Sequence, residues 1–149
     1  MHNFRFLLVL VLLLTSRLSL AATTQVFLLQ NSGWMEPFFT DSKSQLKPLC
    51  KALVQSAGAF SEEIVIASFN QAGAISGEKS PQVIYRGKPV MMEIQRAVQT
   101  INLPKRRDGK YADADFQGAL NGTLLDILDR QPAIIWMVTN NKNDPNNSP

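Results

Sequence analysis

Histidine and cysteine are almost missing from this sequence, which has one of each among 149 residues. His2 lies in the segment that we expect to be removed on export, which excludes a Ser-His-Asp triad, a histidine proton shuttle and a His-ligated zinc site. With Cys50 alone, no intramolecular disulfide can form, and a thiol nucleophile would have no histidine to activate it. A Gly-rich phosphate loop is missing too, because the segment after the first predicted strand offers only Gly33. We therefore expect a protein that is not an enzyme.

The N-terminal segment is typical of a cleavable signal peptide. Its basic start ends at Arg5 and leads into an unbroken apolar run over residues 6–14. Ser19-Leu20-Ala21 places small residues where a signal peptidase reads them, so residues 1–21 are the predicted signal peptide, with a cut after Ala22 as the alternative. An uncleaved N-terminal anchor is the other interpretation, although the run is shorter than the roughly 20 residues of a membrane span. We expect export to the periplasm or medium, with no membrane span after cleavage.

The net charge of the chain is also small once this segment is removed. The chain has 15 basic and 12 acidic residues, and Arg5 and Arg17 leave with the signal peptide, so 13 basic residues face 12 acids. The remaining net charge of about +1 gives no reason to expect nucleic acid or an anionic membrane as the partner. Residues 22–139 are long enough for one domain with a core of its own.

Apolar runs and helical stripes alternate along this domain. Short apolar runs predict strands at residues 25–29, 64–69, 83–85 and 133–138. A 3.6-residue spacing predicts helices at 44–57, 89–101 and 114–130. Gly58 is the expected C-cap of the first helix, and Asp113 the expected N-cap of the third. The predicted core stripes are Leu46, Leu49, Cys50, Leu53 and Val54 in the first helix, and Phe116, Leu120, Leu124 and Ile127 in the third.

This alternation predicts a doubly wound α/β fold, with a mostly parallel sheet and helices on both faces. Ligands of such sheets bind at the carboxyl ends of the strands. The loops that follow Leu29, precede the third helix and follow Val138 are therefore the ones in which a functional site is expected. The first of them, residues 31–44, is rich in Asn, Gly, Pro, Asp and Ser and predicts a loop.

In these three loops the chain resembles the von Willebrand factor A-type domain family. The resemblance covers nearly the whole of residues 22–139 in the order of elements. It implies an Asp-x-Ser-x-Ser motif after the first strand, a threonine before the third helix and an aspartate after the fourth strand. In the family these residues form a metal-ion-dependent adhesion site, which holds Mg²⁺ or a similar cation that accepts a carboxylate of a partner protein.

The residues at these places depart from the family's pattern. The first motif reads Gln30-Asn31-Ser32-Gly33-Trp34, so only its first serine is kept. Ala114 stands where threonine is expected, and Asn140 where the last aspartate is expected. Neutral oxygens compensate poorly for the dehydration of a divalent cation. We therefore predict a degenerate site with no cofactor. The alternative is a Mg²⁺- or Ca²⁺-dependent adhesion domain with the altered ligand set Ser32, Asp113 and Asp115.

A protein partner is expected at the same loops. The predicted partner-binding residues are Gln30, Trp34, Arg106, Arg107 and Asn140. Exposed aromatic side chains anchor protein interfaces. Near Trp34, Phe38 and Phe39 either belong to this interface or fold back as core. The basic loop with Arg106 and Arg107 either receives an acidic partner segment or is an ordinary solvated charge run.

The polar, Asn-rich residues 140–149 predict a loop or tail. Because domains of the resembled family continue beyond this point with further helices and two more strands, the fold is expected to be incomplete on its C-terminal side. Three hypotheses follow. The first is an exported, non-enzymatic protein-interaction module with a decayed ion site, the second is the metal-dependent adhesion domain, and the third is an extracytoplasmic enzyme or enzyme subunit.

Overall fold

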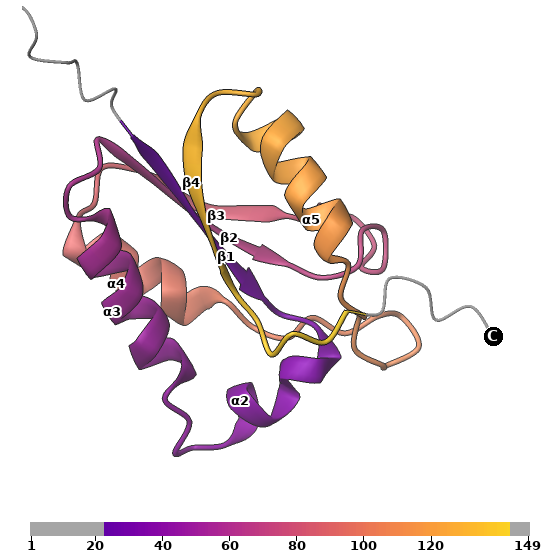
Figure 1. Ribbon diagram of the computed structural model, residues 1–149. Coiled ribbons are helices and arrows are strands. Elements are labelled where there is room, and N and C mark those ends of the chain that lie inside the picture. The colour runs from indigo at the N-terminus through magenta and orange to yellow at the C-terminus, as the bar shows by residue number, and fades with distance from the viewer. Residues whose placement is uncertain (1–22, 144–149) are drawn as a thin grey trace, which may run out of the picture.

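The computed structural model describes residues 23–143 as a four-stranded sheet with helices on both faces (Figure 1). The predicted signal peptide and residues 144–149 lie outside the described residues. The strands are β1 (Thr24–Gln30), β2 (Glu63–Phe69), β3 (Gln82–Gly87) and β4 (Ala133–Val138). The main helices are α2 (Glu36–Thr40), α3 (Leu46–Gly58), α4 (Met91–Thr100) and α5 (Phe116–Gly122). Among these helices none is long and apolar enough to cross a membrane.

The strand order is β3-β2-β1-β4, which makes the sheet mixed. β1 is parallel to β2 on one side and to β4 on the other, with Val26 in register with Val65 and Ile135. β3 is antiparallel to β2 and forms one edge. The general α/β fold and all four predicted strands are therefore confirmed, and the strand predicted at 83–85 extends over the six residues Gln82–Gly87.

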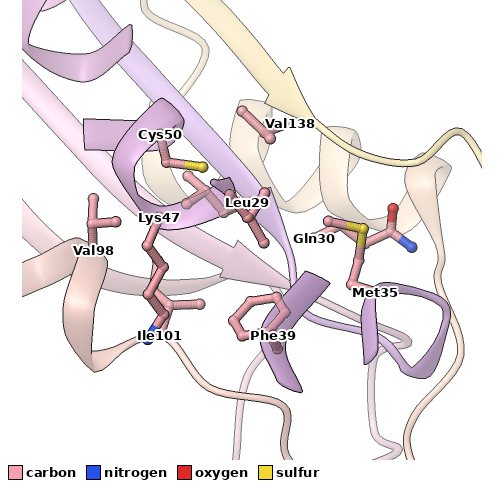
Figure 2. A pocket seen from close by; sticks show the side chains of 10 residues that line it. Leu29, Gln30, Met35, Phe39, Lys47, Cys50, Val98, Ile101 and Val138 are labelled. Carbon is pink, nitrogen blue, oxygen red and sulfur yellow. The ribbon is translucent and has the colours of Figure 1, made fainter. Parts of the chain in front are cut away.

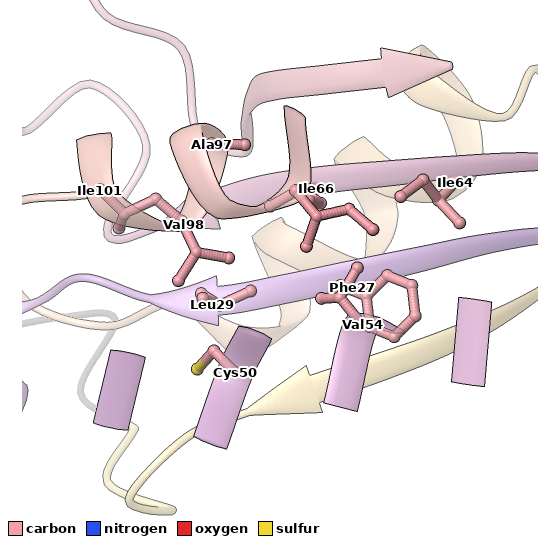
Figure 3. Packing of buried hydrophobic residues seen from close by; sticks show 10 residues of the cluster. Phe27, Leu29, Cys50, Val54, Ile64, Ile66, Ala97, Val98 and Ile101 are labelled. Carbon is pink, nitrogen blue, oxygen red and sulfur yellow. The ribbon is translucent and has the colours of Figure 1, made fainter. Parts of the chain in front are cut away.

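β1 is buried over nearly its whole length because helices cover both sides of it. Its alternating side chains enter two separate cores. Phe27 and Leu29 pack with α3 and α4 in the first core (Figure 3). Val26 and Leu28 pack with α5 and the turn that follows it in the second. Continuous apolar sequence in β1 and β2 thus reflects burial on two faces rather than on one.

The third predicted helix begins later and is less regular than the sequence indicates. Its N-cap is Asp115, not Asp113: the Asp115 carboxylate accepts a hydrogen bond of 2.8 Å from the backbone N–H of Gly118. After Gly122 the helix widens into a π-helical turn, η2 (Thr123–Ile127), in which the N–H of Leu128 bonds the carbonyl of Thr123. The buried residues of this segment are Ala119, Thr123 and Ile127. The predicted core residues Leu120 and Leu124 lie on the neighbouring face and are exposed.

The first loop and first helix also differ from prediction in part. Residues 31–44 contain a 3₁₀ turn, η1 (Gly33–Met35), and the short helix α2. Pro48 lies in the first turn of α3, where its missing N–H costs nothing. Gly58 is the last residue of α3 rather than a cap beyond it, and a Cβ there would lie 2.9 Å from Ile64. Leu49 was predicted to be core but is exposed.

Cys50 is buried in the first core, as predicted, and burial raises the pKa of its thiol to about 11. Thiolate is the reactive form, and little of it exists at neutral pH in this setting. We expect a thiol reagent such as 5,5′-dithiobis(2-nitrobenzoate) to modify Cys50 at pH 8 at least about 100 times more slowly in the folded protein than in urea. Equal rates in the two states would show that Cys50 is accessible in the native protein.

Candidate functional site

The parallel strands β2, β1 and β4 bring their carboxyl ends together at one edge of the sheet, where loops from four parts of the chain meet. Asn31, directly after β1, connects two of these loops through its buried side chain. Its Nδ2 donates to the carbonyl of Asn102 at 3.1 Å, and its Oδ1 accepts from Nδ2 of Asn70 at 3.2 Å. Asn31 therefore has a structural role that the sequence did not indicate.

Gln30, the last residue of β1, lies at the centre of this edge and is 1% exposed. Its Nε2 donates to the hydroxyl of Ser32 at 2.7 Å and to the carbonyl of Lys142 at 3.4 Å. Its Oε1 accepts a short hydrogen bond from the hydroxyl of Thr139. A neutral amide thus occupies the position where the resemblance puts an anionic ligand, and its polar atoms already have partners. Because it is buried, Gln30 holds the loops in place instead of contacting a partner directly.

The segment after β4, for which the sequence predicts a loop or tail from residue 140, crosses the same edge as a loop over residues 139–143. Asn140 donates to the carbonyl of Trp34 at 2.6 Å and accepts from the N–H of Lys142 at 3.1 Å. The Lys142 ammonium lies 4.6 Å from the centre of the Trp34 ring, a cation–π contact. Asn143 accepts from the N–H of Phe116 at 2.9 Å. Residues 139–143 therefore connect β4 to η1 and α5.

All three predicted metal ligands form hydrogen bonds within the protein, Ser32 and Asp115 through the side chain and Asp113 through the backbone. The buried Ser32 hydroxyl accepts from Gln30, and the Asp115 carboxylate caps α5. Asp113 accepts from the N–H of Gln71 through its backbone carbonyl, at 2.7 Å. Across residues 23–143 no three His, Cys, Asp or Glu side chains come together in a group that could hold a metal ion. A hard divalent cation prefers several anionic oxygens, so this donor set fits it poorly.

Phe38 and Phe39 have different environments, which settles the two interpretations of this pair. Met35 and Phe39 face inward and line a small cavity of about 10 Å³ beneath α2, together with Leu29 and Ile101 (Figure 2). Lys47 lies over the Phe39 ring at 5.8 Å, and burial lowers the pKa of its ammonium. Phe38 instead points outward and is 47% exposed. Phe39 is therefore core, and Phe38 belongs to the surface.

An open groove of about 500 Å³ lies beside Phe38, between the α2–α3 segment and the end of β4. Its apolar lining includes Met35, Phe38, Leu46, Leu49 and Val138. Its polar lining comprises Asp41, Ser44 and Gln45 on one side and Thr139 and Asn140 after β4. Leu49 is 62% exposed here. The groove thus borders the network around Gln30, and sequence reasoning missed it because Leu49 fitted a helical core stripe.

The basic loop forms a small hairpin in which Lys105 and Tyr111 pair as a β-bridge. Arg107 donates to the hydroxyl of Ser76 at 3.0 Å, and Arg106 forms an exposed ion pair of 3.4 Å with Asp108. A hollow of about 420 Å³ separates this hairpin from residues 73–76. Arg106 and Arg107 are therefore directed toward this second hollow rather than toward the groove at Phe38.

The base of the hairpin is attached to the first loop. The N–H of Gly33 donates to the carbonyl of Ala112 at 2.8 Å, and a Cβ on Gly33 would come within 2.8 Å of Tyr111. Partial burial raises the pKa of the Tyr111 phenol, and the neighbouring Glu36 carboxylate adds to this. Gly33 therefore allows a close approach that brings the basic hairpin to the same end of the sheet as Trp34.

Comparisons with family models, with curated proteins and with solved structures found no match to this chain. The function of the site at the carboxyl ends of β2, β1 and β4 has therefore to be inferred from its own residues. Residues 23–143 present a neutral, internally bonded centre, an exposed aromatic rim, an apolar groove and a separate basic hollow.

Proposed function

We propose that the chain is an exported, non-enzymatic protein-interaction module of von Willebrand A type that binds its partner without a divalent cation. The observation that carries this proposal is the apolar groove of about 500 Å³ at the carboxyl edge of the sheet, next to the exposed Trp34 and Phe38. In this type of fold, ligands approach at that edge. Aromatic side chains that border a pocket are the usual energetic anchors of protein interfaces.

The neutral centre supports a cation-independent mode. In a metal-dependent adhesion site, the ion receives the partner's carboxylate. Here the position is closed by hydrogen bonds of Gln30 to Ser32 and Thr139, and the Lys142 ammonium lies over the Trp34 ring at the same edge. Instead of an ion, the chain therefore offers its partner an apolar surface and the ammonium of Lys142.

The basic hairpin gives the partner a second expected feature. Arg106 and Arg107 line the hollow of about 420 Å³, and both side chains keep donor N–H groups that their bonds to Asp108 and Ser76 do not use. Guanidinium groups bind carboxylates with two parallel hydrogen bonds. We infer that the partner carries an apolar segment for the groove and acidic side chains for the hairpin.

Site-specific photo-cross-linking tests this function in cells that export the protein. A benzoylphenylalanine at position 38 is expected to cross-link a discrete partner, and the same probe at Met92, which is exposed on α4, is the matched control. The Arg106→Glu/Arg107→Glu variant should reduce the yield at least about fivefold, because it opposes acidic partner groups. Cross-linking must persist in EDTA. Loss of the product in EDTA, with recovery in Mg²⁺, would instead support the metal-dependent adhesion domain.

A further inference from the structure

The hollow between residues 73–76 and the basic hairpin has two walls that are bonded to each other at their bases. The N–H of Gln71 donates to the carbonyl of Asp113 at 2.7 Å, which joins the loop after β2 to the end of the hairpin. The far end of that loop is closed by Ser80, whose hydroxyl accepts from the N–H of Asn70 at 3.0 Å and donates to its carbonyl at 2.6 Å. Their own hydrogen bonds therefore hold both walls in position, which lowers the cost of ordering them around a ligand.

This hollow lies away from the part of the sheet at which the chain continues after β4. The loop over residues 70–81 connects β2 to β3, and β2 and β4 are on opposite sides of β1. The further strands expected from the sequence would come after β4. The lining of the hollow consists of residues within 73–76 and 106–108, so it is complete within the part of the chain that the structure describes.

Two guanidinium groups and one hydroxyl group face the hollow. The full lining is Gly73, Ala74, Ser76, Arg106, Arg107 and Asp108. Arg107 donates to the hydroxyl of Ser76 at 3.0 Å, and the hydroxyl keeps its own hydrogen for a ligand. Asp108 contacts Arg106 at 3.4 Å on the surface, which leaves other N–H groups of that guanidinium to donate. Donors from three side chains thus converge on one recess.

We propose that the acidic group that the hairpin takes from the partner is a phosphate monoester. A carboxylate is planar, and a single guanidinium satisfies both of its oxygens with two parallel hydrogen bonds. A phosphate monoester has three acceptor oxygens and a charge of about −1.5 to −2 at pH 7, so it uses two guanidiniums and a hydroxyl more fully. Residues 105–110 contain four basic side chains and one acid, a net charge of +3 that suits a dianion.

The shape of the hollow favours a phosphorylated side chain over the headgroups of a membrane. Proteins that lie on a bilayer insert large apolar side chains beside their basic ones. Here the guanidiniums face a recess of about 420 Å³, and within residues 23–143 its only apolar lining is Gly73 and Ala74. The proposal rests on the proposed function for the presence of a protein partner, and it names the chemical class of the group that the hairpin binds.

Titration of the isotope-labelled exported protein with phosphoserine, followed by NMR, tests the site directly. We expect a Kd of about 1 mM, with chemical-shift changes confined to residues 73–76 and 106–109. Arg106→Gln/Arg107→Gln should weaken binding at least about 10-fold. Asp108→Asn should tighten it at least about threefold, because it removes the opposing charge and keeps an acceptor for the N–H of Lys110. Arg96→Gln, the matched control on α4, should leave the Kd unchanged.

Two further ligands test the specificity of the hollow. Succinate carries a similar charge on two separated carboxylates and should bind at least about 10-fold more weakly than phosphoserine. Vesicles that contain phosphatidic acid should not sediment with the protein. Equal binding of succinate, or a Kd that Arg106→Gln/Arg107→Gln leaves unchanged, would refute the proposal. Sedimentation with vesicles that phosphoserine reverses would assign the hollow to a lipid headgroup and would also overturn it.

The outcomes separate this proposal from the proposed function. If phosphoserine does not bind while the cross-link from position 38 persists, the phosphate site is refuted and the interaction module stands. If phosphoserine binds as expected but no partner is cross-linked from position 38, the phosphate site stands and the proposed function fails.

Discussion

Replacing Gln30 with glutamate is expected to destabilise the fold by about 3 kcal/mol at pH 8, because it buries a carboxylate without an ion to pair with it. The substitution keeps the side chain's shape and changes its charge. Gln30 is 1% exposed and donates from Nε2 to Ser32 and to the carbonyl of Lys142. A carboxylate cannot donate, so the Lys142 carbonyl would face an acceptor at about the same place.

The pH dependence of this variant distinguishes burial of charge from poor packing. Burial raises the pKa of the new carboxyl in the folded state above its unfolded value of about 4.3. Its contribution to stability is then fully present below that unfolded pKa and is lost as the pH rises through the folded pKa. The gap in unfolding free energy between wild type and Gln30→Glu should therefore be larger at pH 8 than at pH 5. Urea denaturation at the two pH values measures it.

Two controls make the result specific. Gln30→Met removes the hydrogen bonds without adding charge, so its cost should not change between pH 5 and pH 8. Mg²⁺ would stabilise the glutamate variant by mass action if a cation site were still formed at this edge. We expect Mg²⁺ to change the unfolding free energy of wild type and variant equally. A selective gain in the variant would show that Ser32, Asp113 and Asp115 complete a metal site.

Much of the fold could be predicted because apolar patterning reports burial directly. β1 and β2 are continuous apolar runs, and each is covered on both faces. What could not be predicted depends on contacts distant in sequence. The third predicted helix buries Ala119, Thr123 and Ile127 and exposes Leu120 and Leu124, and apolar spacing alone does not show which face of a helix packs against the sheet. The direction of β3 is likewise set by its pairing with β2 rather than by its own residues.

The candidate site was located by the rule that ligands bind at carboxyl ends of strands, and most of its loops were predicted on that basis. The roles of individual residues in the site were harder to predict from the sequence. Gln30 was expected to contact a partner, but its burial gives it a positioning role. Lys142 was predicted to lie in a polar loop or tail, and its contact with Trp34 across 108 positions of sequence leaves no local pattern. Polar loop residues are fixed by partners in space, which composition alone does not reveal.

Phe27, in the middle of β1, is the core residue that contacts both α3 and β4. Phe27 is fully buried, packs with Val54 and Ile64, and stacks on Trp136 of β4. It therefore couples the sheet centre to α3 and to the edge strand. Through β1 it also fixes the position of Gln30, three residues further along the same strand.

Phe27→Ala is accordingly expected to cost about 4 kcal/mol of unfolding free energy, through lost burial and the cavity that remains. The matched control is Val83→Ala on the β3 edge, where the side chain is 43% exposed and the loss should stay below about 1 kcal/mol. Urea denaturation followed by circular dichroism measures both. Because Trp136 loses its stacking partner, its fluorescence should also shift to the red in the folded variant, with Trp34→Phe as background so that it is the only tryptophan left. A cost below about 2 kcal/mol, or an unchanged spectrum, would mean that Trp136 and α3 are not joined through Phe27.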